Sequence, residues 1–220
     1  LNRAKINNVI VSGSLKIERV KDYLEDNYNN NIIKSFKGDD LCIVCGSTWK
    51  EDEKIIFKYI KESKKEKIKW IIAPHDISKK NIERLKSVLT SNYSIYSDIS
   101  NNNVHSNILI LNTIGDLKSV YRYSDISYIG GGMGSSGLHN ILEACIYNKP
   151  VIIGKNYSGF IEAEQLVESG GVASVKDYNE FKLEIEKLIY DKKNIMDKAN
   201  IISNYIKTKT GALSVIQKQL

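Results

Sequence analysis

Residues Tyr128 to Ala144 read YIGGGMGSSGLHNILEA. Five of the eight residues from Gly130 to Gly137 are glycine, and they separate an apolar run from a segment with helical spacing. Glycine loses more conformational freedom on folding than any other residue, so such a loop indicates a close approach of the backbone to something. Free amides beside a helix N-terminus favour an anion such as phosphate. A turn packed against a neighbouring segment explains the glycines equally well.

The alternation of an apolar run and a helical segment continues along the chain. Strands are predicted at residues 8–13, 41–47, 69–74, 93–97, 108–112, 126–131, 150–154 and 171–175. Helices are predicted at 51–66, 79–89, 115–123, 138–147, 162–168, 178–190, 192–207 and 212–219. The runs are rich in Ile and Val and show little alternation, as parallel strands covered on both faces do. We therefore predict one α/β domain over residues 1–220, with a Rossmann-like, doubly wound parallel sheet.

Composition narrows the class of protein. The 220 residues carry a net charge of +6, most of it from lysine. The densest basic patch, residues 61–69, is interrupted by glutamates and lacks interleaved arginines and aromatics. It fits a solvated helix end, and we predict no nucleic-acid partner. No apolar run approaches the roughly 20 residues of a membrane span. Because the chain starts with Leu rather than Met, we expect a piece of a longer protein.

Cys42 and Cys45 form a C-x-x-C inside a predicted strand. Residues three apart on a strand point to opposite faces, so these two thiols should not pair. We expect free structural cysteines in a reducing compartment. No Cys and His cluster has the spacing of metal ligands, and we predict neither a metal nor a cofactor.

Ligands of doubly wound sheets bind beyond the carboxyl ends of the strands. Asn140 and Glu143 are i and i+3 on the predicted helix after the glycine loop, so they share a face. A carboxylate there can accept hydrogen bonds from ribose hydroxyls, although a charge near a helix N-terminus is the structural alternative. The phosphate and sugar of such a ligand are predicted to contact Gly131, Gly132, Gly134 and Ser47.

Several segments together resemble the C-terminal half of the 3-deoxy-D-manno-octulosonic acid (Kdo) transferases. They are VSGSLKIERV (11–20), GSTW (46–49), WIIAPH (70–75), NTIGDL (112–117), YRYSDISYIGGGMGSSGLHNILEA (121–144) and KPVIIGKNYSGFIEAEQLVESGG (149–171). The resemblance implies the C-terminal domain of a GT-B glycosyltransferase, which binds the sugar nucleotide. It also implies transfer of Kdo from CMP-Kdo to a lipid A precursor at the cytoplasmic face of the inner membrane, in lipopolysaccharide biosynthesis.

The resemblance also implies which residues contact CMP. They are Pro74, His75, Ile114, Gly115, Asp116, Asn140, Ile141, Leu142 and Glu143. The family commonly has arginine where this chain has His75, and glutamate where it has Asp116. Its general base lies in the N-terminal domain with the acceptor site and the membrane contact, so we expect no catalytic residue in this chain. The fragment alone is expected to be soluble and inactive.

Two other readings share the fold and the glycine loop. One is a GT-B transferase or an epimerase that uses a UDP-sugar. The other is a non-catalytic nucleotide-binding module.

Overall fold

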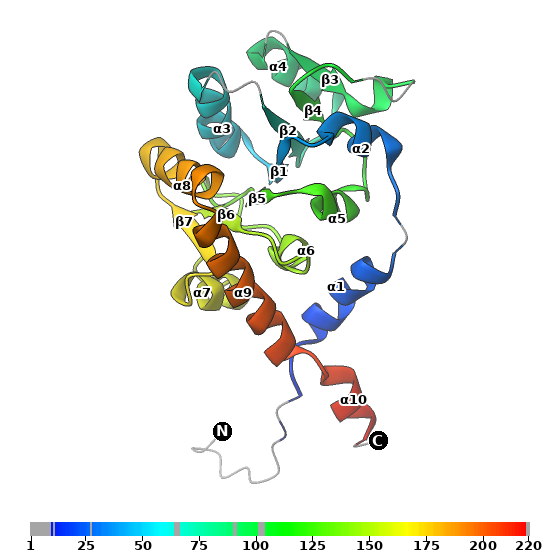
Figure 1. The fold of residues 1–220 in the computed structure, drawn as a ribbon, viewed down its shortest axis with the longest axis vertical. Coiled ribbons are helices and arrows are strands. Elements are labelled where there is room, and N and C mark those ends of the chain that lie inside the picture. The colour runs from blue at the N-terminus through cyan, green and yellow to red at the C-terminus, as the bar shows by residue number, and fades with distance from the viewer. Residues whose placement is uncertain are drawn as a thin grey trace.

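Seven parallel strands form one sheet with the order β3-β4-β2-β1-β5-β6-β7 (Figure 1). The computed structural model describes residues 10, 12–26, 28–63, 67–89, 92–100 and 104–218. The strands are β1 (Leu41–Thr48), β2 (Ile68–Pro74), β3 (Tyr93–Ile95), β4 (Ile108–Ile110), β5 (Ile126–Ile129), β6 (Val151–Gly154) and β7 (Val172–Val175). Every neighbouring pair is parallel. The predicted Rossmann-like, doubly wound α/β sheet is confirmed.

The direction of chain growth across the sheet reverses at β1. From β1 the chain adds β2 and the outer strands on one side, and it then returns to β5 on the other side of β1. β1 and β5 are in register from the Ile43–Ile126 pair to the Gly46–Ile129 pair, so their carboxyl ends lie side by side. The loops that follow them lead to helices on opposite faces of the sheet. Such a switch point is where doubly wound sheets bind ligands.

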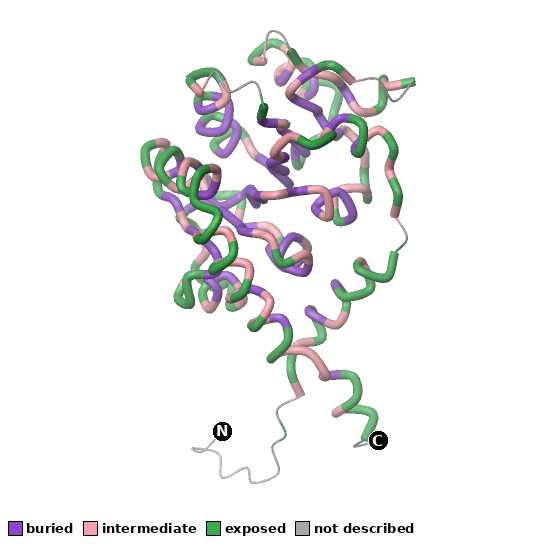
Figure 2. Tube along the Cα trace, in the orientation of Figure 1, coloured by how far each residue is buried: buried purple, intermediate pink, exposed green. Residues whose placement is uncertain are grey.

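Helices cover both faces of the sheet. One face packs against α1 (Leu15–Glu25), α2 (Asn31–Lys37), α5 (Leu117–Val120), α6 (Leu142–Cys145), α7 (Ile161–Glu168) and α9 (Lys192–Lys209). The other packs against α3 (Lys50–Ser63), α4 (Lys79–Leu89) and α8 (Tyr178–Tyr190), while α10 (Ala212–Gln217) contacts α1. Two 3-10 turns, η2 (Tyr96–Asp98) and η3 (Tyr121–Tyr123), complete the described elements. Figure 2 shows the strands as the buried centre, which explains their unbroken apolar sequences.

The two cysteines of the C-x-x-C lie on opposite faces of β1. Cys42 belongs to one core layer and Cys45 to the other, and both are free. Burial raises the pKa of the Cys42 thiol to about 12. The prediction that these thiols are structural and unpaired is confirmed.

Three predicted elements are wrong in part. Of the predicted strand 8–13, the described residues 10, 12 and 13 are not in a strand, and the others lie outside the described residues. The helix predicted over 138–147 is only Leu142–Cys145. The residues before it are not helical, and they fold back on the start of the glycine loop, where the His139 amide donates to the Gly130 carbonyl at 3.2 Å. The helix predicted from Gly115 likewise begins at Leu117.

The sequence pattern did not predict α1 or α2. α1 buries only Ile17 and Val20 of its eleven residues, and two buried positions do not make a clear helical period. No helix in the described part of the chain is both long and apolar enough to cross a bilayer.

Candidate functional site

The ends of β1 and β5 are packed tightly at the switch point. The Gly130 amide donates to the Gly46 carbonyl at 2.9 Å. A Cβ on Gly130 would lie 2.2 Å from the carbonyl oxygen of Ser47, and a Cβ on Gly46 would lie 1.8 Å from the Tyr121 hydroxyl. Glycine at these two positions therefore serves close packing between neighbouring segments.

A buried carboxylate joins the two loops that follow these strands. Asp52, in the first turn of α3, is 0% exposed. It accepts hydrogen bonds from the Trp49 amide (2.9 Å), the Gly131 amide (2.8 Å) and the Tyr128 hydroxyl (2.7 Å). The Gly131 amide, which the sequence assigned to a phosphate, is thus already engaged by a protein anion. Asp52 sets where the glycine loop begins.

We expect Asp52→Asn to destabilise the protein by about 2–3 kcal/mol, because the Trp49 and Gly131 amides would bond to a neutral oxygen instead of a carboxylate, and the buried Tyr128 hydroxyl would lose the acceptor of its proton. For a chain of this size that loss is a fall in Tm of roughly 4–12 °C. Thermal melts against Glu51→Gln, an exposed acid on the same turn of α3, measure it. Equal melting temperatures of the two variants would contradict the role of Asp52.

The rest of the glycine loop divides into a packed part and an open part. A Cβ on Gly132 would lie 3.0 Å from the Gly154 amide nitrogen and 3.1 Å from its Cα, both backbone atoms of β6. A Cβ on Gly134 would meet only the end of the Glu51 side chain, at 3.1 Å. Ser135 and Ser136 are exposed. Close packing therefore explains the glycines up to Gly132, while the loop around Gly134 is open enough to admit a ligand.

An aromatic stack covers the strand ends next to the loop. The His75 ring stacks on that of Trp49 (centroids 4.5 Å apart) and makes a tilted contact with that of His139 (4.6 Å). The Trp49 Nε1 donates to His139 Nε2 at 3.1 Å, so the neutral His139 ring carries its proton on Nδ1. Burial, and then the neighbouring His75, lower the pKa of His139. The sequence analysis assigned a ligand contact to His75 and none to Trp49 or His139, which come from separate loops.

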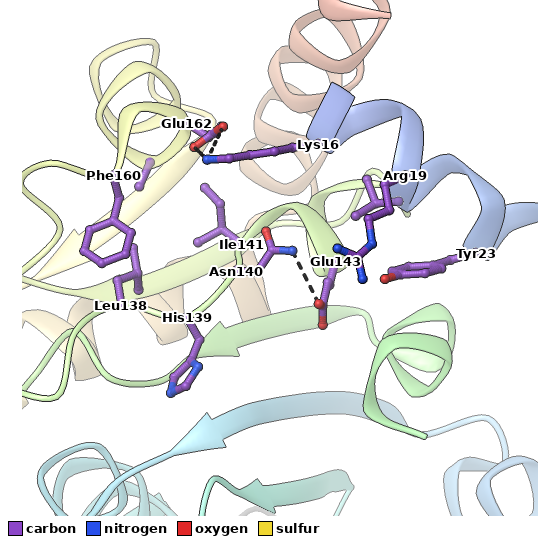
Figure 3. A pocket seen from close by; sticks show the side chains of 12 residues that line it. Lys16, Arg19, Tyr23, Leu138, His139, Asn140, Ile141, Glu143, Phe160 and Glu162 are labelled. Atoms are coloured by element: carbon purple, nitrogen blue, oxygen red, sulfur yellow. Dashed lines mark hydrogen bonds and ion pairs between the residues drawn. The ribbon is translucent and has the colours of Figure 1, made fainter. Parts of the chain in front are cut away.

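A pocket of about 400 Å³ opens beside this stack (Figure 3). Its lining residues come from α1, the loop before α6, α6 itself and the start of α7. They are Lys16, Arg19, Val20, Tyr23, Leu138, His139, Asn140, Ile141, Glu143, Phe160, Glu162 and Ala163. Three predicted ligand contacts, Asn140, Ile141 and Glu143, are therefore brought together. Leu142 is buried in the core layer below, and its amide donates to the Asn140 side chain at 3.1 Å.

Glu143 is a half-buried acid in the wall of the pocket. Its Oε1 accepts a hydrogen bond from Asn140 Nδ2 at 3.3 Å, although Asn140 precedes the helix rather than lying on it. Burial raises the pKa of Glu143, and the Asn140 hydrogen bond and the nearby Lys118 and Arg19 oppose that rise. Among the residues that the structure describes, no other side chain or amide is seen to donate to this half-buried carboxylate, which therefore keeps lone pairs for a ligand.

The remaining predicted residues lie at neighbouring strand ends. Ile114 is 88% exposed, and Gly115 has φ +92° with no atom within 4 Å of an ideal Cβ, so the loop after β4 is open. Asp116 is the N-cap of α5, without a side-chain capping bond. Pro74 ends β2 and is buried, and Ser47 has φ +51° at the end of β1. No group of three or more His, Cys, Asp and Glu in the described residues is arranged to hold a metal.

The wall that α1 contributes was missed from the sequence. α1 is held in place because the Ser14 amide donates to the Lys209 carbonyl (2.8 Å) and Glu18 accepts the Ala212 amide (3.0 Å). These partners are almost 200 residues away, so local pattern does not reveal them. The one available signal was the resemblance over residues 11–20, which singled out no side chain there.

The fold defines a class of domain. The seven-stranded parallel sheet is Rossmann-like, and solved structures of a glycosyltransferase and of a UDP-N-acetylglucosamine 2-epimerase share it. The C-terminal CMP-Kdo binding domain of WaaA from Acinetobacter baumannii has this fold, with a TM-score of 0.68 and 15% identity over 87% of this chain and 97% of that one.

Sequence relatives are named glycosyltransferases. A bifunctional glycosyltransferase/methyltransferase of Fusobacterium nucleatum is 30% identical over 212 residues, 94% of this chain and 32% of the relative. A Kdo transferase of Aquifex aeolicus is 28% identical over 156 residues, 70% of this chain and 43% of the relative. The resemblance to Kdo transferases is thus confirmed, and the chain spans less than half the length of these relatives. No family model matches the chain.

Proposed function

We propose that the 220 residues form one domain that binds the donor, CMP-Kdo, for a Kdo transferase. The observation that carries the proposal is the Asn140–Glu143 pair in an open pocket beside the switch point. Similarity to the Kdo transferases supports the choice of nucleotide. The acceptor is a lipid A precursor at the cytoplasmic face of the inner membrane, and the residues that bind it lie outside this chain.

Each part of the site has a separate task in this proposal. Glu143 accepts hydrogen bonds from the ribose hydroxyls, and the exposed Ile114 side chain contacts the base beside the open backbone of Gly115. The glycine loop beyond Gly131 donates amides to the phosphate. The chain binds and orients the donor, while the base that activates the acceptor comes from another domain.

We expect CMP to bind this chain at least about tenfold more tightly than UDP, a difference of about 1.4 kcal/mol. Isothermal calorimetry with both nucleotides measures it. Tighter binding of UDP would identify an enzyme that uses UDP-sugars. If neither nucleotide binds, the proposal of a nucleotide site is contradicted. Incubation with CMP-Kdo and a lipid A precursor is expected to give no transfer, and turnover by this chain alone would contradict the division of tasks.

A further inference from the structure

Around Glu143, at one end of the pocket, cations outnumber carboxylates: Arg19 lines the pocket, and Lys118 lies outside the lining. Arg19 and Tyr23 extend from α1 toward Glu143 (Figure 3). Arg19 makes no ion pair with any described residue. Lys118 from α5 is also close, with its Nζ 4.9 Å from the centre of the Tyr23 ring. Two cations therefore lie near the single carboxylate of Glu143. An anionic ligand group would balance this excess.

The other end of the pocket is neutral. Lys16 and Glu162 form a salt bridge of 3.0 Å that joins α1 to α7. The wall between the two ends is apolar, with side chains of Leu138, Ile141 and Phe160. An apolar wall suits the C–H face of a sugar ring, and the charged end suits a substituent of that ring.

We propose that Arg19 binds the carboxylate of an acidic sugar on the donor nucleotide and so selects for that class of sugar. The inference rests on the proposed function, in which Glu143 holds the ribose at the same end of the pocket. The planar guanidinium presents a fork of donors that matches a carboxylate. The phosphate has a separate candidate partner in the amides of the glycine loop, so the carboxylate is the anion left for Arg19.

Calorimetry with CMP and with freshly prepared CMP-Kdo tests this assignment in three proteins: the parent, Arg19→Gln and Lys21→Gln. Lys21 is a matched control, an exposed cation on α1 outside the pocket. We expect the parent to bind CMP-Kdo about tenfold more tightly than CMP, as for one charge-assisted contact. Arg19→Gln should lose that preference and keep the affinity for CMP, while Lys21→Gln should keep both. Arg19 is exposed, so melting temperatures should not change.

Two results would overturn the inference and leave the proposed function intact. One is a preference for CMP-Kdo that survives in Arg19→Gln. The other is an equal loss of CMP and CMP-Kdo affinity in that variant, which would place Arg19 on the phosphate. If the parent binds neither ligand, the proposed function and this inference fail together.

Discussion

Glu143→Gln is expected to weaken CMP binding by about tenfold to a hundredfold, because hydrogen bonds to a charged acceptor contribute about 1.5–3 kcal/mol. The same variant should be at least as stable as the parent at pH 7. Burial raises the pKa of Glu143, so its contribution to stability is fully present below the unfolded pKa and is lost as pH rises through the folded pKa. The glutamine side chain of the variant does not ionise, so its contribution to stability does not fall as the pH rises.

Thermal melts at several pH values test the predicted stability of Glu143→Gln, and calorimetry with CMP tests its predicted loss of affinity. The Tm advantage of Glu143→Gln over the parent should be present at pH 7 and should disappear below about pH 4, where an unfolded glutamate is protonated. Glu168→Gln, an exposed acid at the end of α7 and outside the pocket, is the control. Unchanged CMP affinity together with a lower Tm would show that Glu143 only stabilises the start of α6.

Valine substitutions at two glycines of the same loop are both expected to abolish CMP binding, but only one of them should also unfold the protein. Gly132→Val would push a branched side chain into the Gly154 backbone, 3.0 Å from its amide nitrogen. Gly154 is the last residue of β6 and pairs with Val175 of β7, so moving it disrupts the sheet, and we expect a loss beyond the about 1–3 kcal/mol of ordinary overpacking. Gly134→Val meets only the flexible end of Glu51, so the fold should survive while the branched side chain blocks the approach of the phosphate.

Thermal melts and CMP titration separate these outcomes. Gly134→Val should melt within a few degrees of the parent and lose CMP binding, and Gly132→Val should lose both. Ser135→Ala and Ser136→Ala, at exposed positions of the same loop, should change neither if backbone amides make the contacts. If Gly134→Val folds and binds CMP like the parent, the loop does not bind the phosphate and its glycines serve packing alone.

Local sequence determined the sheet and most of the helices. Buried parallel strands need apolar side chains on both faces, so the runs that became β1, β2 and β4 to β7 were visible without any contact information. The opposite faces of Cys42 and Cys45 followed from the alternation of side chains along a strand. The grouping of Asn140 with Glu143 also came from spacing, although the helix begins after Asn140.

The tertiary structure decided what each glycine and each site residue does. The Gly131 amide is occupied by Asp52, and Gly132 faces Gly154, because segments from other parts of the chain lie there. The α1 wall of the pocket, with Arg19, depends on contacts with residues near the other end of the chain. Sequence spacing reports only neighbours along one element, whereas a pocket forms where separate elements meet, and that meeting is set by the packing of the whole sheet.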